Sequence, residues 1–471
     1  MIAYQARWVL PMCPSQPAII EHGVVVVDGA HIAFVGRADD ADRPATDPDA
    51  PNVEHVQLGN SVLMPGLVNA HSHLELTAMR GMLEGLAFRD WLATLTAARR
   101  DLFDAGTLLD AARHGLREAL RNGITTCADT SDSGAPLQAM REAGTRGVGY
   151  VETFGPDPAS CADAIKTLRE RAAAYREHDT ALVRVGISPH APYTVSGALF
   201  GAVAALAHDE GYPVAVHIAE SAAETQFVRD GAGPFAEGLR ARGIAVQASA
   251  RSPVALLHST GLLAARPLLI HAIHADDADL ALIAGHGATV VHCPISNAKL
   301  GQGIARLQPM LDAGIAVGLG TDSVASNDRM DLLGEARQAT LLAALQARVP
   351  DALPAMRALE LATIGGARAL GLFDRIGSIE AGKEADLVAF PMSSPDVTAV
   401  HDPAVTLVHV LAGTVRASLV LVAGRELVRA GELLAADDGL DVRVAAKGVQ
   451  LQEWMRARRV ALPITRHVHF G

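Results

Sequence analysis

The chain contains 471 residues, of which 49% are hydrophobic, 20% are charged and 4% are aromatic. This composition is that of a globular protein with room for one large domain and a smaller one. The net charge of −12 at pH 7 argues against a surface that binds nucleic acid. No uninterrupted apolar run reaches the roughly 20 residues that span a bilayer, so no membrane association is expected.

The N-terminus and the cysteines indicate the compartment. The first residues, Met1-Ile-Ala-Tyr-Gln-Ala-Arg-Trp8, lack the basic region and apolar core of a secretory signal. The four cysteines, at positions 13, 127, 161 and 293, show no CxxC spacing. This argues against a disulfide framework and against a thiolate zinc site. A cytoplasmic location is expected.

Residues 1–60 predict short strands and turns. Four valines at 24–27 precede Asp28-Gly29, a turn signal, and residues 31–36 then complete a hairpin. The stretch 38–51 is rich in Asp, Ala and Pro and is expected to be an exposed loop. No chemistry is visible in this part.

Residues 61–373 follow a different rhythm, in which short apolar runs alternate with helix-compatible segments rich in Ala, Leu, Glu and Arg. Such runs predict parallel strands buried on both faces, and eight of them with helices between fit a TIM (β/α)8 barrel. A doubly wound sheet is the competing fold, but no Gly-x-Gly-x-x-Gly follows an early strand. The predicted strands are 62–73, 124–130, 148–154, 182–190, 214–220, 268–274, 289–296 and 316–323.

The remaining chain predicts two further parts. Strand patterns in residues 374–432 are expected to join those of residues 1–60 in a small β-sandwich domain built from both chain ends. Residues 433–471 predict a helical C-terminal extension. The apolar stretch 83–95 could serve a homodimer interface, and packing into the core explains the same pattern.

Polar residues gather where the predicted strands end, which is where TIM barrels carry their chemistry. Of the 19 histidines, seven fall at these ends. Scattered core histidines would not show this concentration, so a metal site is favoured. The strand-end residues, in strand order, are His71, His73, Asp129, Glu152, His190, His217, Glu220, His271, His274, His292 and Asp322.

A ligand set for one metal ion per chain can be chosen from these residues. His71 and His73 lie two apart on a strand, so both side chains point to the same face. His217 and Asp322 add a third imidazole and a carboxylate. A nitrogen and oxygen set of this kind suits Zn²⁺, with Fe²⁺ or Mn²⁺ also compatible. Alone, the Gly-Thr-Asp sequence at Asp322 is equally typical of a turn or a helix N-cap.

Further strand-end residues suit proton transfer and charge stabilisation. Glu220 lies three residues after His217, where a carboxyl can shuttle protons beside a metal-activated water, and Asp322 can accept the proton of that water. His271 is placed to stabilise developing negative charge. His190 is flanked by two prolines and predicts a substrate contact, with a structural hydrogen bond as the alternative. His274 is either a partner of His271 or a loop residue.

Together these motifs resemble the amidohydrolase superfamily, in its branch of adenosine-type deaminases and triazine chlorohydrolases. The resemblance rests on the sequences that start at Met64 (Met-Pro-Gly-Leu-Val-Asn-Ala-His-Ser-His), Val216 (Val-His-Ile-Ala-Glu), Val291 (Val-His-Cys-Pro-Ile-Ser-Asn-Ala-Lys-Leu-Gly) and Gly320 (Gly-Thr-Asp-Ser), with His271. It implies a mononuclear metal site at His71, His73, His217 and Asp322. It also implies acid–base and polarising roles for Glu220 and His271, and deamination of a ring amidine.

The resemblance also bears on the substrate. Trp91 matches the S-adenosylhomocysteine/methylthioadenosine deaminases, but Arg100 stands where they carry a ribose-binding glutamate. The segments around Glu152 and His190 are more similar to aminofutalosine deaminase of menaquinone biosynthesis. This predicts an adenine nucleoside substrate whose carboxylate pairs with Arg100 or Arg146.

Other functions remain alternatives at this stage. They are deamination of S-adenosylhomocysteine or methylthioadenosine, deamination of guanine or 8-oxoguanine, and triazine chlorohydrolysis. A metal-free scaffold protein of the same fold is disfavoured, because all four ligand positions are filled.

Overall fold

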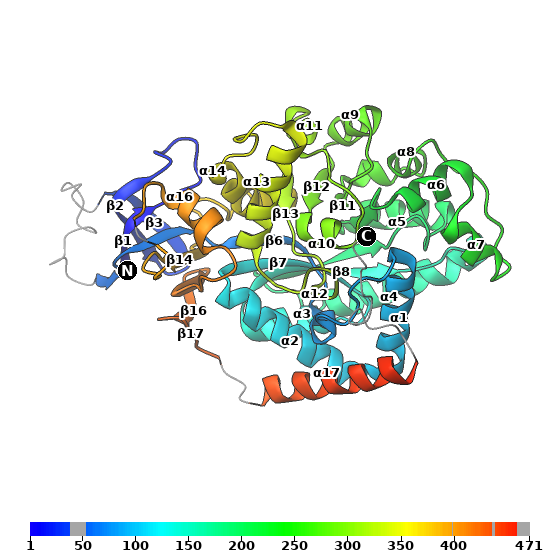
Figure 1. Cartoon of the computed structure of the whole chain (residues 1–471), viewed down its shortest axis with the longest axis horizontal. Helices are drawn as coiled ribbons and strands as arrows, with labels where there is room; N and C mark the ends of the chain where they lie inside the picture. Colours follow the sequence, from blue (N-terminus) through cyan, green and yellow to red (C-terminus); the bar gives the residue numbers. More distant parts are fainter. Residues whose placement is uncertain (38–52, 398, 436–438, 459–471) are drawn as a thin grey trace, which may run out of the picture.

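The computed structural model describes residues 1–37, 53–397, 399–435 and 439–458 (Figure 1). The loop expected at 38–51 and the end of the predicted C-terminal extension, residues 459–471, lie outside this description. Among the described residues, no helix has the length and apolar character needed to cross a membrane.

The central element is a parallel barrel, as the sequence predicts. Strands pair in order as two four-stranded sheets. Parallel bridges between Ile187 and Val214 and between Ser72 and Asp322 join the two sheets at both edges and close the ring. The strands are β6 Leu67–Ser72, β7 Ile124–Ser131, β8 Arg146–Thr153, β9 Val183–Pro189, β10 Ala215–Ile218, β11 Leu268–His271, β12 Thr289–His292 and β13 Val317–Leu319.

Helices surround this barrel (Figure 1). The longer helices carry apolar side chains at helical spacing, and the stripe that these side chains form packs against the strands. In α2, for example, Leu108, Ala112, Leu116 and Ala119 are buried. The helices along the barrel are α1 Phe88–Leu102, α2 Ala105–Arg121, α3 Ala135–Ala143, α4 Cys161–Arg176, α5 Gly197–Glu210, α6 Ala222–Asp230, α7 Pro234–Arg240, α8 Pro253–Ser259, α9 Asp277–His286, α10 Pro294–Lys299, α11 Leu307–Asp312, α12 Val324–Asn327, α13 Leu332–Ala347, α14 Ala355–Glu360 and α15 Gly366–Ala369.

Several predicted strands end differently from expectation. Those predicted to end at 220, 274 and 323 stop at Ile218, His271 and Leu319, and two others differ for a visible reason. The run 62–73 is divided at Pro65-Gly66 into β5 Ser61–Pro65, which leaves the barrel, and β6. A Cβ at Gly66 would lie 2.2 Å from the Thr125 hydroxyl, so the chain turns where only glycine fits. The seventh strand stops at His292 rather than near 296, because Pro294 starts α10.

Both ends of the chain build a second sheet, at the blue and orange end of Figure 1. We expected a β-sandwich, and hydrogen bonds connect these strands in one continuous nine-stranded sheet in the order β17-β16-β15-β14-β5-β1-β2-β3, with β4 also paired to β1. Beyond β5, the strands are β1 Ile2–Val9, β2 Ile20–Asp28, β3 His31–Arg37, β4 Glu54–Gln57, β14 Leu387–Pro391, β15 Leu419–Val422, β16 Arg425–Arg429 and β17 Glu432–Leu433.

The C-terminal helix α17, Leu440–Ala457, lies along α2 and α1 (Figure 1). Its Leu451 and Met455 are buried in a cluster with Leu83 and Trp91. In the stretch 83–95, core packing thus accounts for Leu83, Trp91 and Leu95, whereas Leu86, Phe88 and Leu92 are half-buried, and the homodimer interface stays a prediction.

Arg146 connects the barrel to the second sheet. It begins β8, and its guanidinium donates to the Asp386 carboxylate at 2.7 and 2.9 Å and to Glu384 at 2.5 Å. Its side chain is 1% exposed. The prediction that Arg146 contacts substrate is wrong. It stands at the amino end of a strand, opposite the end where barrels hold their substrates.

We expect Arg146→Met to lower the free energy of unfolding by about 3–5 kcal/mol, because it leaves a buried carboxylate without its partner. Urea denaturation of the variant and the wild type measures this difference. Arg100→Ala is the matched control. Its side chain is 70% exposed, and its loss is expected to change stability by no more than about 0.5 kcal/mol. Equal stability of the Arg146 variant and the wild type would contradict this role.

Candidate active site

A cavity of about 360 Å³ opens at the carboxyl ends of the barrel strands. Its floor is polar and its outer wall is aromatic and aliphatic. It is lined by His73, Glu75, Leu76, Phe88, Trp91, Leu92, Leu95, Thr96, Arg99, Asp132, Glu152, Phe154, His190, Tyr193, Thr194, His217, Glu220, His271, Leu300, Asp322 and Ser323.

The four predicted metal ligands meet at the floor of this cavity. The Asp322 carboxylate lies 3.3 Å from Nε2 of His71 and 3.6 Å from Nε2 of His73. The ring of His217 has its centroid 5.0 Å from that of His71 and 5.5 Å from that of His73. Side chains two residues apart at the end of β6 point to the same face, and the barrel closes between β6 and β13. These two features bring together residues that are as far as 251 positions apart in the sequence.

These residues fit a metal ion. His71 Nε2 is buried and has no hydrogen-bond partner among the described residues. His217 Nδ1 lies 3.3 Å from the backbone oxygen of His190, so it can donate there and leave Nε2 for a metal. Ligand atoms of the three histidines lie within 4.8 Å of one another. Three imidazoles with one carboxylate are a donor set that zinc accepts.

The protonation states of these residues also suit metal binding. Burial lowers the pKa of His71 to about 4 and that of His217 well below its ordinary value. Burial acts to raise the pKa of Asp322, but the adjacent imidazole of His71, 3.3 Å away, outweighs it and holds this pKa well below its usual range. Neutral imidazoles and an ionised carboxylate are the forms that bind metals.

The backbone around the site is held in unusual conformations. Asp322, His271 and Ala219 have φ angles of 58°, 73° and 50°, a region that residues with side chains rarely adopt. Strain of this kind persists where surrounding contacts fix the chain, and it gathers at functional sites. At Gly320 an added Cβ would lie 2.9 Å from the His71 backbone nitrogen, so glycine is required for Asp322 to approach the histidines.

Glu220 and His271 stand beside the ligands, as predicted for the acid–base and polarising groups. Glu220 Oε1 lies 3.7 Å from His271 Nε2. His271 Nδ1 is 2.9 Å from Asn297 Oδ1, which orients the ring. Burial raises the pKa of Glu220 well above its ordinary value, and the neighbouring Asp322 and Glu224 carboxyls raise it further. A carboxyl in this state can both donate and accept a proton near neutral pH.

Three of the predicted substrate contacts, Trp91, Glu152 and His190, line the cavity. Glu152 is 7% exposed, and its Oε1 has no hydrogen-bond partner among the described residues. His190 bonds the Thr194 hydroxyl at 2.8 Å. Arg100 does not reach the cavity and instead pairs with Asp101 on the outer face of α1, so this prediction is wrong. With 3.6 residues per turn, Arg100 lies about 180° around α1 from Trp91, whereas Arg99 lies about 80° from it and reaches the cavity.

Sequence reasoning missed the polar group beside Arg99. Arg99 binds Glu75 at 2.8 Å and also pairs with Asp132. Among the described lining residues, Arg99 is the one Arg or Lys, and both of its partners are carboxylates. The position of Arg99 one turn after Leu95 on the apolar face of α1 could have identified this arginine, and the position of Glu75 two residues after His73 could have identified that glutamate.

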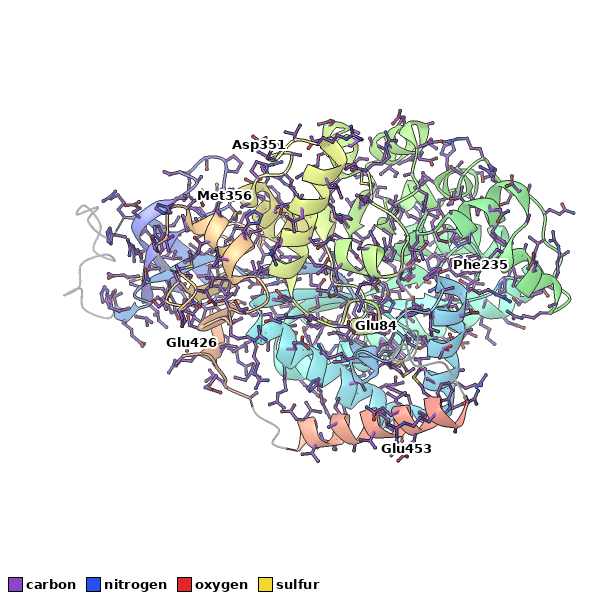
Figure 2. All side chains as sticks on the ribbon, viewed as in Figure 1. Glu84, Phe235, Asp351, Met356, Glu426 and Glu453 are labelled. Atoms are coloured by element: carbon purple, nitrogen blue, oxygen red, sulfur yellow. The ribbon has the colours of Figure 1, made fainter. Side chains whose placement is uncertain are left out.

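Apart from Trp91, the aromatic residues of the cavity wall were not predicted from sequence. Phe88 and Phe154 line the cavity with four leucines. Tyr193 stacks on Phe235 of α7 at 4.1 Å between ring centroids, and Phe235 is labelled in Figure 2. Four strand-end residues are absent from the described lining of the cavity: His71, which lies behind the other ligands, and Asp129, His274 and His292. His274 Nε2 instead bonds the Gln302 carbonyl at 3.0 Å.

Comparison with known proteins agrees with this geometry. The profile of a family described as "Amidohydrolase family" matches residues 62–426. The chain belongs to the amidohydrolase family. This assigns it to a family of enzymes and accounts for the barrel with its histidines at strand ends.

Individual relatives span almost the whole chain. A 5-methylthioadenosine/S-adenosylhomocysteine deaminase of Nitratidesulfovibrio vulgaris strain Hildenborough is 33% identical over 407 residues, covering 84% of this chain and 85% of that protein. A zinc-bound adenosine deaminase of Xanthomonas campestris is 29% identical with a TM-score of 0.83, covering 97% and 98% of the two chains. A zinc complex of atrazine chlorohydrolase from Arthrobacter aurescens is 26% identical with a TM-score of 0.80, covering 96% and 100%.

Helicobacter pylori aminofutalosine deaminase also shares the fold. Its TM-score is 0.76 with 22% identity, covering 91% of this chain and 100% of that chain. This degree of identity supports a common architecture and carries no conclusion about substrate.

We expect His217→Ala to lower zinc affinity by more than about 100-fold, since outer partners of a ligand already change affinity 10–100-fold. His190→Ala, whose ring centroid lies 4.9 Å from that of His217, is the matched control and should still bind one zinc per chain. Metal content after chelation and reloading, measured by plasma mass spectrometry, gives the result. Full zinc in the His217 variant would contradict the assignment.

Proposed function

We propose that this protein is a zinc-dependent deaminase that replaces the 6-amino group of an adenine nucleoside with oxygen, with 5′-methylthioadenosine as its preferred type of substrate. The observation that carries the proposal is Glu220, a buried carboxyl 3.7 Å from His271 and directly beside the proposed ligand set. The names of the curated relatives, among them the Nitratidesulfovibrio deaminase, point the same way.

The arrangement suits displacement of an amine. His71, His73, His217 and Asp322 would hold a zinc ion, which would supply an activated water as the nucleophile near neutral pH. Glu220 can give a proton to the purine ring nitrogen and to the departing ammonia. His271 Nδ1 donates to Asn297 Oδ1, so neutral His271 presents an unprotonated Nε2 that can accept a hydrogen bond from the attacking water and orient it.

Retention of Glu220 also favours deamination over dechlorination. The amino group is a poor leaving group until it takes up a proton and can depart as ammonia, whereas chloride departs without a proton. A chlorohydrolase therefore has less need of a buried, proton-donating carboxyl. Guanine-type bases remain alternatives that the substrate panel below distinguishes.

The wall of the cavity supports an uncharged group at the 5′ end of the nucleoside. Phe88, Leu95 and Leu300 offer apolar surface suited to a methylthio group. Arg99 is already engaged by Glu75 and Asp132. A substrate carboxylate would have to draw Arg99 from Glu75, which is only 4% exposed, and leave that glutamate unpaired.

The aminofutalosine hypothesis loses both arginine contacts that were expected for the substrate carboxylate. Arg100 faces outward on α1, and Arg146 is paired with Asp386 at the opposite end of the barrel. A role in menaquinone biosynthesis thus stays a prediction without support from the cavity.

We expect kcat/KM for 5′-methylthioadenosine to exceed that for S-adenosylhomocysteine, adenosine and aminofutalosine. The zinc-loaded enzyme is assayed by ammonia release and by the ultraviolet change from an adenine to a hypoxanthine chromophore. Turnover of aminofutalosine well above the others would contradict the preference and restore the menaquinone hypothesis. Activity confined to guanine, 8-oxoguanine or a triazine would overturn the nucleoside proposal.

Glu220→Gln is expected to lower kcat for 5′-methylthioadenosine by about 100-fold or more, since positioned acid–base groups contribute 10²–10⁴-fold. Glu237→Gln, an exposed carboxyl of α7, serves as the matched control and should act like the wild type. Steady-state kinetics of the three proteins at equal zinc content give the kcat values to be compared. Wild-type kcat in the Glu220 variant would exclude Glu220 as the proton shuttle.

A further inference from the structure

A second buried glutamate binds the backbone that carries Glu220. Glu224 lies in the first turn of α6 and is 0% exposed. One of its carboxylate oxygens accepts a hydrogen bond from the Ala219 N–H at 2.7 Å, and the other accepts one from the Glu220 N–H at 2.9 Å. The carboxylate thus holds two successive peptide groups between the end of β10 and α6.

In sequence, this glutamate has the pattern of an ordinary helix cap. Ser221-Ala-Ala-Glu224 matches the capping box, in which the serine caps the helix and the glutamate bonds back to the N–H of the serine. Ser221 does cap α6, accepting from the Glu224 N–H at 3.1 Å. The Glu224 carboxylate instead accepts from N–H groups one and two residues further back, those of Glu220 and Ala219. The motif therefore extends beyond the helix into the active-site loop.

The Ala219–Glu220 segment that Glu224 binds has a strained backbone, and hydrogen bonds fix it from both sides. Ala219 has a φ of 50°, which costs conformational energy for a residue with a side chain. On its other side, the Ala219 carbonyl accepts from the His274 N–H at 2.9 Å. Glu224 thus supplies the acceptors without which two buried N–H groups at this turn would lack partners.

We propose that Glu224 is a positioning residue that sets the direction of the Glu220 carboxyl by fixing the Ala219–Glu220 backbone. This inference rests on the proposed function, since it assigns Glu224 to the proton-transfer part of that reaction. Glu224 does not line the cavity among the described residues, so it acts through Glu220 and not on the substrate.

The test compares two leaving groups. Glu224→Gln keeps one acceptor oxygen but turns an amide N–H₂ toward the other backbone N–H, so the turn must shift. We expect kcat for 5′-methylthioadenosine to fall by about 10–100-fold, since displacement by about 1 Å can cost 10²-fold. For 6-chloropurine riboside, chloride leaves without a proton and Glu220 has only the ring nitrogen to protonate, so we expect a loss several-fold smaller than for 5′-methylthioadenosine. Zinc content and KM should stay as in the wild type.

Glu335→Gln is the matched control. Glu335 is another fully buried carboxyl outside the cavity, and it accepts from the Ile295 N–H at 3.1 Å. It also binds Asn327, whose side chain donates to the Thr321 carbonyl next to Asp322 at 2.6 Å. Because this network supports a metal ligand and not Glu220, its loss should reduce activity on both substrates by the same factor.

Equal losses on both substrates in Glu224→Gln, or loss of zinc, would overturn the inference. Should this variant not fold, Glu224→Asp, which keeps the charge on a shorter side chain, gives the same comparison. If the wild type deaminates no adenine nucleoside, the proposed function and this inference fall together. If it does so and the ratio of the two activities is unchanged by the variants, the inference alone fails.

Discussion

The rest of the site depends on one electrostatic constraint, the burial of Asp322 among three neutral imidazoles. A carboxylate that is 6% exposed needs compensation, because removing its charge from water is costly. Ser296 and Ser326 donate to one of its oxygens at 2.5 and 3.0 Å. The other oxygen faces His71 and His73, whose low pKa values leave them unprotonated. A divalent cation completes this set, and the strained backbone and close glycine contacts hold the ligands where it binds.

Buried carboxyls outside the cavity support this arrangement from behind. Glu224 binds the backbone of Glu220, and Glu335 connects the start of α10 to Asn327. Asp129 accepts from the Ser72 hydroxyl and the Leu74 N–H, on either side of His73. Each of these groups anchors a turn that follows a barrel strand. Placement of the reactive groups therefore relies on hydrogen bonds that the cavity itself does not reveal.

The residues at the floor of the site could be predicted from sequence, because the regular geometry of β-strands determines their positions. Two-residue alternation in β6 and the convergence of parallel strand ends determine where His71, His73, His217 and Asp322 lie. The residues of the cavity wall were harder to predict, because their positions depend on the rotation of each helix about its axis and on packing between segments distant in sequence. Arg99 and Arg100 are adjacent in sequence but face different sides of α1. Arg146 starts a strand, and only the fold shows that it meets Asp386, 240 residues away. The same applies to β5, which a local apolar pattern assigned to the barrel.

Anomalous diffraction at the zinc absorption edge, from crystals of the zinc-loaded enzyme, tests directly whether the four proposed ligands bind the metal. We expect one strong anomalous peak per chain, within coordination distance of His71, His73, His217 and Asp322. Glu220 and His271 should lie close to this peak but outside the ligand set. A peak at other residues, or no peak at this site in crystals of active enzyme, would contradict this assignment.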